Sequence, residues 1–411
     1  MTIGSTPPFY GWRVVQATLV VAFIAWSFAL YGPSVYIQAL SQTRGWPVGQ
    51  VSAALTFSFL LNAISVGVVG SIIGRFGPQV IMAIGALVMA TGIIAIGQVT
   101  EPWQAFMAFP IMGLGWSCLS TIAISATIAP WFERFQGRAI SIALLGASLG
   151  GMLGVPISLL LVAQLGFSEA MIAIGLIVMV TVIPISLFVL KRRPQDLGLE
   201  PDGIARNAGG ILPVNRTWTR TGALQTFALR STIITFGIAL MVQLGFLSQQ
   251  VKLLQEYITT TQTALTVLAS GTLAFLGRVL LARIADQTNI RMAAAVTLLV
   301  SAVGLTITAT ADSAAQLIIG TLIFGFNVGN LTTLPALIVR REFGAPSFGK
   351  VFGITGTFMQ AISALGPALF GLLHDSTGNY SLPIGLAAVL MVGGAILITR
   401  THGIQNNHRT R

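Results

Sequence analysis

One arginine stands inside an apolar stretch of the sequence, where a charged side chain is unusual. Arg278 lies in the run LASGTLAFLGRVLLARIADQ, which covers residues 268 to 287. An arginine in the middle of a membrane span costs about 2.5–3.5 kcal/mol on insertion scales, so it normally has a function. Its planar guanidinium can donate two parallel hydrogen bonds to a carboxylate. The residue type and its place therefore predict that Arg278 faces a central cavity and binds an anion.

The alternative for Arg278 is a structural one. A long arginine side chain can extend along the helix and place its charge at the membrane surface. Arg283, beside Asp286, already stands at the end of the same run and suits that surface position. This second arginine favours the cavity interpretation for Arg278.

Several uncharged polar residues also fall inside apolar stretches. Asn62, Asn327, Asn330 and Gln360 are candidates for substrate binding, but amides in lipid also commonly join neighbouring helices. His374 and Asp375 end another apolar run, where a helix-end role is the simpler interpretation and proton handling the alternative.

The composition identifies the elements that must position these residues. Of the 411 residues, 54% are hydrophobic and only 8% are charged, against about a quarter in soluble proteins. At roughly 20 apolar residues per crossing, we predict an all-α membrane protein with twelve spans. The predicted spans are 14–38, 50–73, 78–98, 103–130, 138–163, 168–190, 231–255, 263–285, 292–311, 314–339, 349–373 and 382–400.

The basic residues predict the orientation. With a cytoplasmic N-terminus, 19 of the 22 lysines and arginines fall on the inside, leaving Arg44 and Lys252 outside and Arg278 within the membrane. Cytoplasmic loops carry such an excess, so we expect both termini in the cytoplasm. The expected location is the inner (plasma) membrane of a bacterium. The single cysteine, Cys118, excludes an intrachain disulfide.

The chain is predicted to consist of two related halves. The long polar stretch after the sixth span indicates a cytoplasmic linker at 191–230, between six-helix bundles at 1–190 and 231–411, the second with a short cytoplasmic tail. A shift of 212 positions places 70–79 on 282–291 and 131–154 on 343–366, and it aligns Asn330 with Cys118. A parallel repeat of six-helix units is one way in which transporters are built, with the substrate between the halves.

With these features the sequence resembles the major facilitator superfamily over its full length. ARIADQTNIR (282–291) and GSIIGRFGPQ (70–79) are similar to the signature loop of that superfamily. The type within the superfamily that it resembles most is that of the monocarboxylate and oxalate–formate carriers. That resemblance is carried by GPALFGLLHDSTGNY (366–380), APWFERFQGRAISIALLGASLGG (129–151) and RRPQDLGLEPDG (192–203). It implies alternating access and a substrate-binding arginine in the eighth helix, at Arg278.

The sequence also departs from these relatives. The proton-carrying aspartate one turn before the arginine is Ala274 here, the lysine of the eleventh helix in oxalate exchangers is Met359, and a tyrosine common in the fourth helix is Thr121. One intramembrane cation favours a monoanion over a dianion. Relatives also place substrate contacts near Tyr36 and Gln38, although Tyr36 equally suits an aromatic residue at the outer interface.

The expected function is secondary active transport of a small organic anion, a monocarboxylate. The sequence has no G-x-x-x-x-G-K-[ST] phosphate loop, no H-E-x-x-H and no serine–histidine constellation, so we expect no ATPase, no enzyme, no metal and no cofactor. The expected partners are the substrate anion, a coupling proton or counter-anion and the lipid bilayer. No nucleic acid is expected, because the basic residues form no continuous face, and the protein is expected to work as a monomer. The alternatives are a polyspecific drug or metabolite exporter of the same fold and a non-transporting membrane sensor.

Overall fold

The computed structural model describes residues 9–133, 135–191, 194, 218–284 and 287–400, and these residues form helices without any strand. Twelve of the helical segments are long and apolar enough to cross a membrane, which confirms the predicted number of spans. The predicted start of the seventh span was four residues late, since the helix begins at Phe227.

The first half of the chain contains six spans, three of which are interrupted. The first span is divided into α1 (Tyr10–Ala25), the π-helix η1 (Trp26–Tyr31) and α2 (Pro33–Arg44). The others are α3 (Val48–Phe76), α4 (Pro78–Gln98), α5 (Pro102–Ser117) with α6 (Thr121–Ile128) and the 3₁₀ turn η2 (Ala129–Trp131), α7 (Gln136–Leu165), and α8 (Phe167–Pro184) with the π-helix η3 (Ile185–Val189). We call this set the N-terminal bundle.

The second half begins with a short helix, α9 (Arg220–Gln225), which lies inside the stretch predicted as a linker. Its six spans are α10 (Phe227–Gln255), α11 (Thr260–Ile284), α12 (Ile290–Ala309), α13 (Ala314–Phe343), α14 (Ala345–Ser363) continued by α15 (Gly366–Thr377), and α16 (Ser381–Thr399). We call the helices from α10 to α16 the C-terminal bundle.

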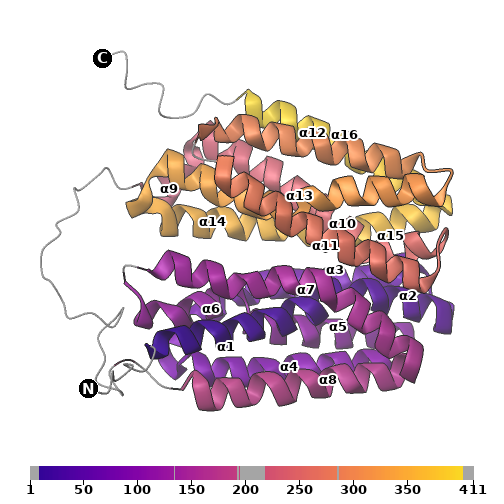
Figure 1. Ribbon diagram of the computed structural model, residues 1–411, viewed down its shortest axis with the longest axis horizontal. Coiled ribbons are helices and arrows are strands. Elements are labelled where there is room, and N and C mark those ends of the chain that lie inside the picture. The colour runs from indigo at the N-terminus through magenta and orange to yellow at the C-terminus, as the bar shows by residue number, and fades with distance from the viewer. Residues whose placement is uncertain (1–8, 134, 192–193, 195–217, 285–286, 401–411) are drawn as a thin grey trace, which may run out of the picture.

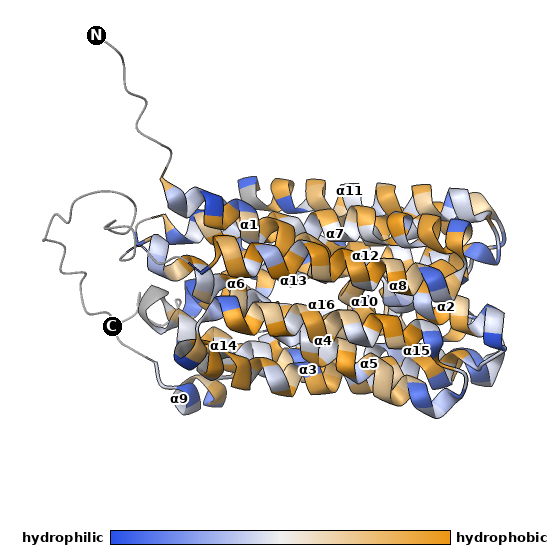
Figure 2. Ribbon diagram, turned by 90° about the horizontal axis from the view of Figure 1, so that it is seen from below, coloured by the Kyte–Doolittle hydropathy of each residue, from blue (hydrophilic) through white to orange (hydrophobic). Residues whose placement is uncertain are grey.

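The two bundles lie side by side with their helices roughly parallel to one long axis (Figure 1). Within the N-terminal bundle α4 packs on α8, α3 on α5 and α1 on α7, and within the C-terminal bundle α12 packs on α13 and α16. Apolar residues cover the middle of the helices and polar residues gather towards both ends, as in a protein that spans a bilayer (Figure 2). We call the end where α1 begins the Tyr10 end and the opposite one, where α2 stops, the Arg44 end.

Three helix pairs make most of the contact between the bundles: α3 with α15, α7 with α11, and α2 with α10, while α14 also touches α3. Two of these helices follow a break at a proline. Pro33 begins α2, and Pro367 is in the first turn of α15. Proline cannot donate a backbone hydrogen bond and its ring disturbs the preceding turn. Before Pro33 the Gly32 N–H donates instead to the Ser27 carbonyl, which closes the π-helical turn.

Candidate functional site

Arg278 lies at the boundary between the bundles and its guanidinium bonds to both. Nη1 donates to the Ser148 hydroxyl of α7 at 2.6 Å, while Nη2 donates to the Thr332 hydroxyl of α13 at 3.2 Å. Nε donates to the Gly329 carbonyl at 3.4 Å. A guanidinium has five N–H groups, so among the described residues two remain without a partner. Each of the three acceptors is a neutral oxygen.

The partners of Arg278 lie further from the Tyr10 end of their helices than Arg278 lies from that end of its own. At about 1.5 Å of rise per residue, Arg278 is about 9 Å from the Tyr10 end of its helix. Ser148 and Thr332 are each about 16–18 Å from that end of α7 and α13, by the same rise. A side chain extended towards the membrane surface would have partners nearer the helix end. The described partners of Arg278 therefore fit the cavity interpretation better than the surface one.

The N-terminal bundle brings a second polar group to this place. The Tyr31 hydroxyl is close enough to Arg278 for an electrostatic interaction between them. Tyr31 is the last residue of the π-helix η1, and its ring packs on Gly151 of α7, where a Cβ would lie 2.9 Å from the ring. Single π-turns inside helices often occur at functional sites. The two interacting groups belong to different bundles, Tyr31 to the N-terminal bundle and Arg278 to the C-terminal bundle.

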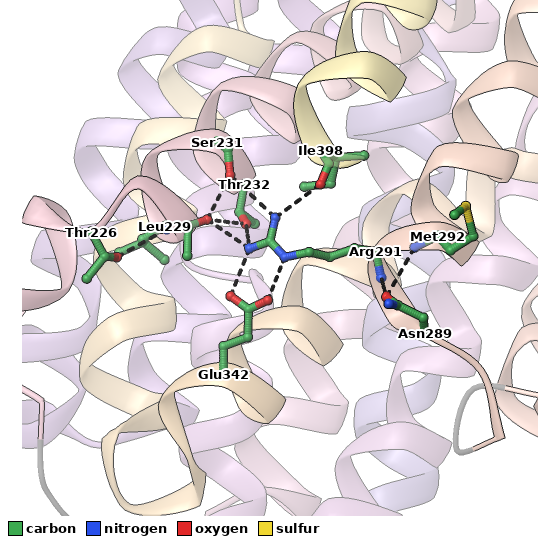
Figure 3. A network of polar contacts seen from close by, with 10 residues as sticks. Thr226, Leu229, Ser231, Thr232, Asn289, Arg291, Met292, Glu342 and Ile398 are labelled. Atoms are coloured by element: carbon green, nitrogen blue, oxygen red, sulfur yellow. Dashed lines mark hydrogen bonds and ion pairs between the residues drawn. The ribbon is translucent and has the colours of Figure 1, made fainter. Parts of the chain in front are cut away.

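Arg291 shows what a paired arginine looks like in the same molecule (Figure 3). Its Nε and Nη2 bond to the two carboxylate oxygens of Glu342 at 2.6 and 2.8 Å, and both side chains are less than a tenth exposed. Its remaining bonds run to the Ala228 and Ile398 carbonyls and to the hydroxyls of Ser231 and Thr232. Arg291 thus has an internal carboxylate and joins helices of the C-terminal bundle. Arg278 has no carboxylate among its described partners.

The predicted contacts in the first two spans are bonded within the protein. Tyr36 is fully buried and donates to the Phe28 carbonyl at 3.0 Å, within its own span. Gln38 donates across the bundles to the Gln255 side chain at 2.8 Å, at the Arg44 end. Asn62 donates to the Gly113 carbonyl at 3.0 Å and so joins α3 to α5. None of the three bonds to Arg278.

The remaining candidates are distributed over three spans. Asn327 is buried and donates to the Ile323 carbonyl of its own helix, whereas the side-chain oxygen of buried Asn330 has no hydrogen-bond partner among the described residues. Thr121 is exposed at the start of α6. Met359 is 5% exposed, and Gln360 beside it is half-buried. Their roles in binding stay predictions, and no group of three or more potential metal ligands occurs in the described ranges.

The sequence analysis did not predict three residues of the candidate site, namely Tyr31, Ser148 and Thr332. Ser148 and Thr332 are small hydroxyl residues in apolar helices, where many serines and threonines simply bond to their own backbone. Thr332 does so too, since its hydroxyl donates to the Gly329 carbonyl at 2.9 Å. Their positions relative to Arg278 follow from the packing of α7 and α13 against α11, which the sequence alone does not display.

Comparison with known proteins identifies the fold that holds this site. The sequence profile of the Major Facilitator Superfamily matches residues 17–300. The chain belongs to this superfamily. It is similar to bovine "Monocarboxylate transporter 13", with 23% identity over 96% of this chain and 90% of the relative. It is also similar to "Aspyridones efflux protein apdF" of Emericella nidulans, with 24% identity over 90% of this chain and 72% of the relative.

A solved structure has the same fold. The bacterial homologue of the human lysosomal transporter Spinster, in an "Inward-facing And Occupied Conformation", matches 97% of this chain and 98% of its own with a TM-score of 0.76. Sequence identity is 12%, so this likeness concerns the fold. The protein is a multi-pass membrane protein of a transporter family, as its twelve apolar helices also indicate.

Proposed function

We propose that the protein is a secondary transporter that carries a small organic anion by alternating access, with Arg278 as the group that binds the anion. The observation that supports this most is the unpaired charge of Arg278 at the boundary between the bundles. Its three described bonds reach neutral oxygens, and two N–H groups are left over. An uncompensated buried charge is unfavourable, so an incoming carboxylate that pairs with it gains affinity.

The place of the site suits a transport cycle. Arg278 belongs to the C-terminal bundle and Ser148 to the N-terminal bundle, so an anion bound here would contact both moving parts. Transporters of this kind hold the substrate between two repeats that rock against each other. Nothing in the proposal requires catalysis or a cofactor.

We propose a monocarboxylate as the substrate. A second anionic group would enter a low-dielectric site without a cation, at a cost of several kcal/mol. Met359 occupies the position where oxalate exchangers carry a lysine, and it is buried. The name of the bovine relative, a monocarboxylate transporter, is consistent with this substrate class.

The rival proposal is an exporter of larger metabolites, and the name of the Emericella relative favours it. Exporters of cationic drugs commonly use a buried acid. The described partners of Arg278 include no carboxylate, and the buried Glu342 is already bonded to Arg291. This arrangement favours an anionic cargo over a cationic one.

We also propose that the Tyr10 end lies in the cytoplasm, with the bundles divided by a linker at 191–230. The basic residues support this orientation, because only Arg44 and Lys252 of the loop cations fall at the Arg44 end. Near that end α15 packs extensively on α3, whereas α14, nearer the Tyr10 end, touches α3 at far fewer positions. The structure then corresponds to a state open towards the cytoplasm.

The test is thermal stabilisation of the purified protein by a panel of small carboxylates. A ligand present at a hundred times its Kd stabilises the folded state by about 2.7 kcal/mol. We expect stabilisation of the wild type, none for Arg278→Ala, and little for Arg278→Lys, which keeps the charge but loses the planar fork.

The matched control is Arg283→Ala, which removes an exposed arginine five residues further along the same helix. It should respond to carboxylates as the wild type does. Full stabilisation of Arg278→Ala by the same acids would overturn the assignment of Arg278 as the anion-binding group.

A further inference from the structure

Two hydrogen-bond donors are unused at the interruption between α5 and α6. Trp116 is in the last turn of α5, and its buried indole N–H has no acceptor among the described residues. Ser120 is the N-cap of α6, but its buried hydroxyl caps no N–H of that helix and has no other partner in the described part of the chain. A buried donor without an acceptor is destabilising, and it often has a functional reason. The two groups are therefore candidates for bonds to a ligand.

Three aromatic rings from three different spans meet beside these donors. The ring centroid of Trp116 is 6.0 Å from that of Trp26 in η1, with the two planes perpendicular, and 5.9 Å from that of Phe59 in α3. Trp116 and Phe59 are 7% and 2% exposed, whereas Trp26 is half-buried. Trp26 therefore forms the accessible side of this group, which we call the tryptophan pocket.

Trp26 shares the accessible side of its span with Tyr31. Within η1 the residues Trp26, Leu30 and Tyr31 are half-buried, while 27–29 are buried. Hydrogen bonds in a π-helix join residues five apart, so Trp26 and Tyr31 lie almost above one another. In an α-helix the same two residues would point about 140° apart. Since Tyr31 interacts with Arg278, the side of η1 that carries Trp26 belongs to the candidate site.

The unused donors also lie at a suitable depth. At about 1.5 Å of rise per residue, Ser120 is about 16 Å and Trp116 about 22 Å from the Tyr10 end of their span. The residues that bond to Arg278, Ser148 and Thr332, are at about 16–18 Å by the same rise. A ligand whose carboxylate pairs with Arg278 and whose body extends towards the middle of the membrane would therefore reach the level of both donors.

We propose that the tryptophan pocket is the second part of the substrate site, and that it selects an aromatic monocarboxylic acid with a hydrogen-bond acceptor on its ring. Trp26 turns away from Trp116, the ring of the substrate stacks in its place, and the acceptor receives the indole N–H, with the Ser120 hydroxyl as a second donor. Stacked rings attract one another beyond the effect of the buried area. The inference rests on the proposed function, because Arg278 is taken to bind the carboxylate.

The test is calorimetric titration of the purified full-length protein with two pairs of acids. Benzoate and cyclohexanecarboxylate differ in whether the ring is aromatic, and we expect benzoate to bind about threefold more tightly. The compounds 4-acetylbenzoate and 4-isopropylbenzoate are similar in shape, but only the first carries an acceptor on the ring substituent. We expect 4-acetylbenzoate to bind about fivefold more tightly, because only this acid can satisfy the indole N–H.

Two variants assign these preferences to residues. Trp116→Phe keeps an aromatic ring against Phe59 but has no N–H, so the difference between the acetyl and isopropyl acids should disappear while benzoate still binds. Trp26→Leu should remove the preference for benzoate over cyclohexanecarboxylate. The matched control is Trp103→Phe, at the other end of α5, where the tryptophan is 61% exposed. This control should bind all four acids as the wild type does.

The outcomes separate the pocket from the binding of the carboxylate. Equal affinity of the wild type for the acetyl and isopropyl acids would overturn the proposal without any variant, and so would a Trp116→Phe protein that keeps the difference. In both cases a loss of binding in Arg278→Ala would leave the proposed function intact. Binding that persists in Arg278→Ala, with an acetyl preference that Trp116→Phe removes, would support the pocket and contradict Arg278 as the anion-binding group. A wild type that binds none of the four acids would overturn both.

Discussion

At the scale of single residues, the contrast between Arg291, which is buried, and Arg278, which is half-buried, supports most of the functional argument. Arg291 forms a bidentate pair with Glu342, whereas Arg278 bonds to two hydroxyls and one carbonyl. The sequence analysis placed Arg291 in a loop and Arg278 inside a span, and it predicted the hydrogen-bond partners of neither. Only the geometry shows which of the two keeps N–H groups for a ligand.

The Ser148 hydroxyl accepts a hydrogen bond from Nη1 of Arg278. In Ser148→Ala that N–H loses its acceptor, and an unsatisfied buried donor costs about 1–3 kcal/mol. We therefore expect a lower thermal unfolding midpoint without ligand and a larger stabilisation by a bound carboxylate than in the wild type. The control Ser141→Ala changes a serine of the same helix that bonds to its own backbone. Equal effects of the two variants would show that the Ser148 bond has no special role.

At this scale the sequence predicted the cation but not its surroundings. Arg278 stands out because a charge inside an apolar run is rare. Tyr31, Ser148 and Thr332 come from three other helices, and their approach to Arg278 depends on tertiary packing and on the π-turn before Gly32. Asn62 and Gln38 were predicted as substrate contacts, and the structure bonds both within the protein.

At the scale of the helices, the Arg291–Glu342 pair ties α12 to α13 and to the neighbouring α10. Removing one partner of a buried ion pair typically costs about 3–5 kcal/mol, because the other charge is left buried. Glu342→Leu should therefore lower the unfolding midpoint strongly. The double variant Arg291→Met with Glu342→Leu should recover a large part of the loss, since no charge remains unpaired. A double variant less stable than Glu342→Leu would contradict this explanation.

The close packing of α3 on α15 allows a prediction about the separation of these two helices. In Gly371→Ala the new Cβ would lie 2.7 Å from Ser52 and 2.9 Å from the Gly49 backbone, so the helices must move apart. We expect greater labelling of a cysteine at Ser52 by a polar thiol reagent, without loss of folding. Gly356→Ala in α14 has open space around its Cβ and serves as the control. Unchanged labelling in Gly371→Ala would show that the helices are not closely packed there.

At the scale of the whole molecule, the orientation in the membrane can be tested without a substrate. After Cys118→Ser, we expect Arg44→Cys to react with an impermeant thiol reagent on intact cells. Arg220→Cys at the start of α9 should react only after permeabilisation, because the basic residues favour a cytoplasmic Tyr10 end. The reverse pattern of labelling would invert the proposed orientation.

The architecture was the part most accessible from the sequence. Long apolar runs and their spacing predicted twelve spans, and the structure and the family match confirm this fold. The interruptions at Trp26–Tyr31 and around Ser363–Gly366 were not predicted, because hydropathy is continuous across them while the backbone is not. Bonds between the bundles, such as that of Gln38 to Gln255, also depend on how the bundles pack, which no periodicity within one helix reveals.

The central claim is that the Arg278 cation selects an anionic substrate, and binding of a matched series of small molecules tests it most directly. Calorimetric titration of the purified protein would compare lactate, malonate, lactamide and isopropanolamine, which are similar in size and differ in charge. The account predicts that lactate binds most tightly, that malonate is weakened by its second unpaired charge and lactamide by its lack of charge, and that the difference between lactate and lactamide disappears in Arg278→Ala. Tightest binding of isopropanolamine, retained in Arg278→Ala, would contradict the account and favour an exporter of cations.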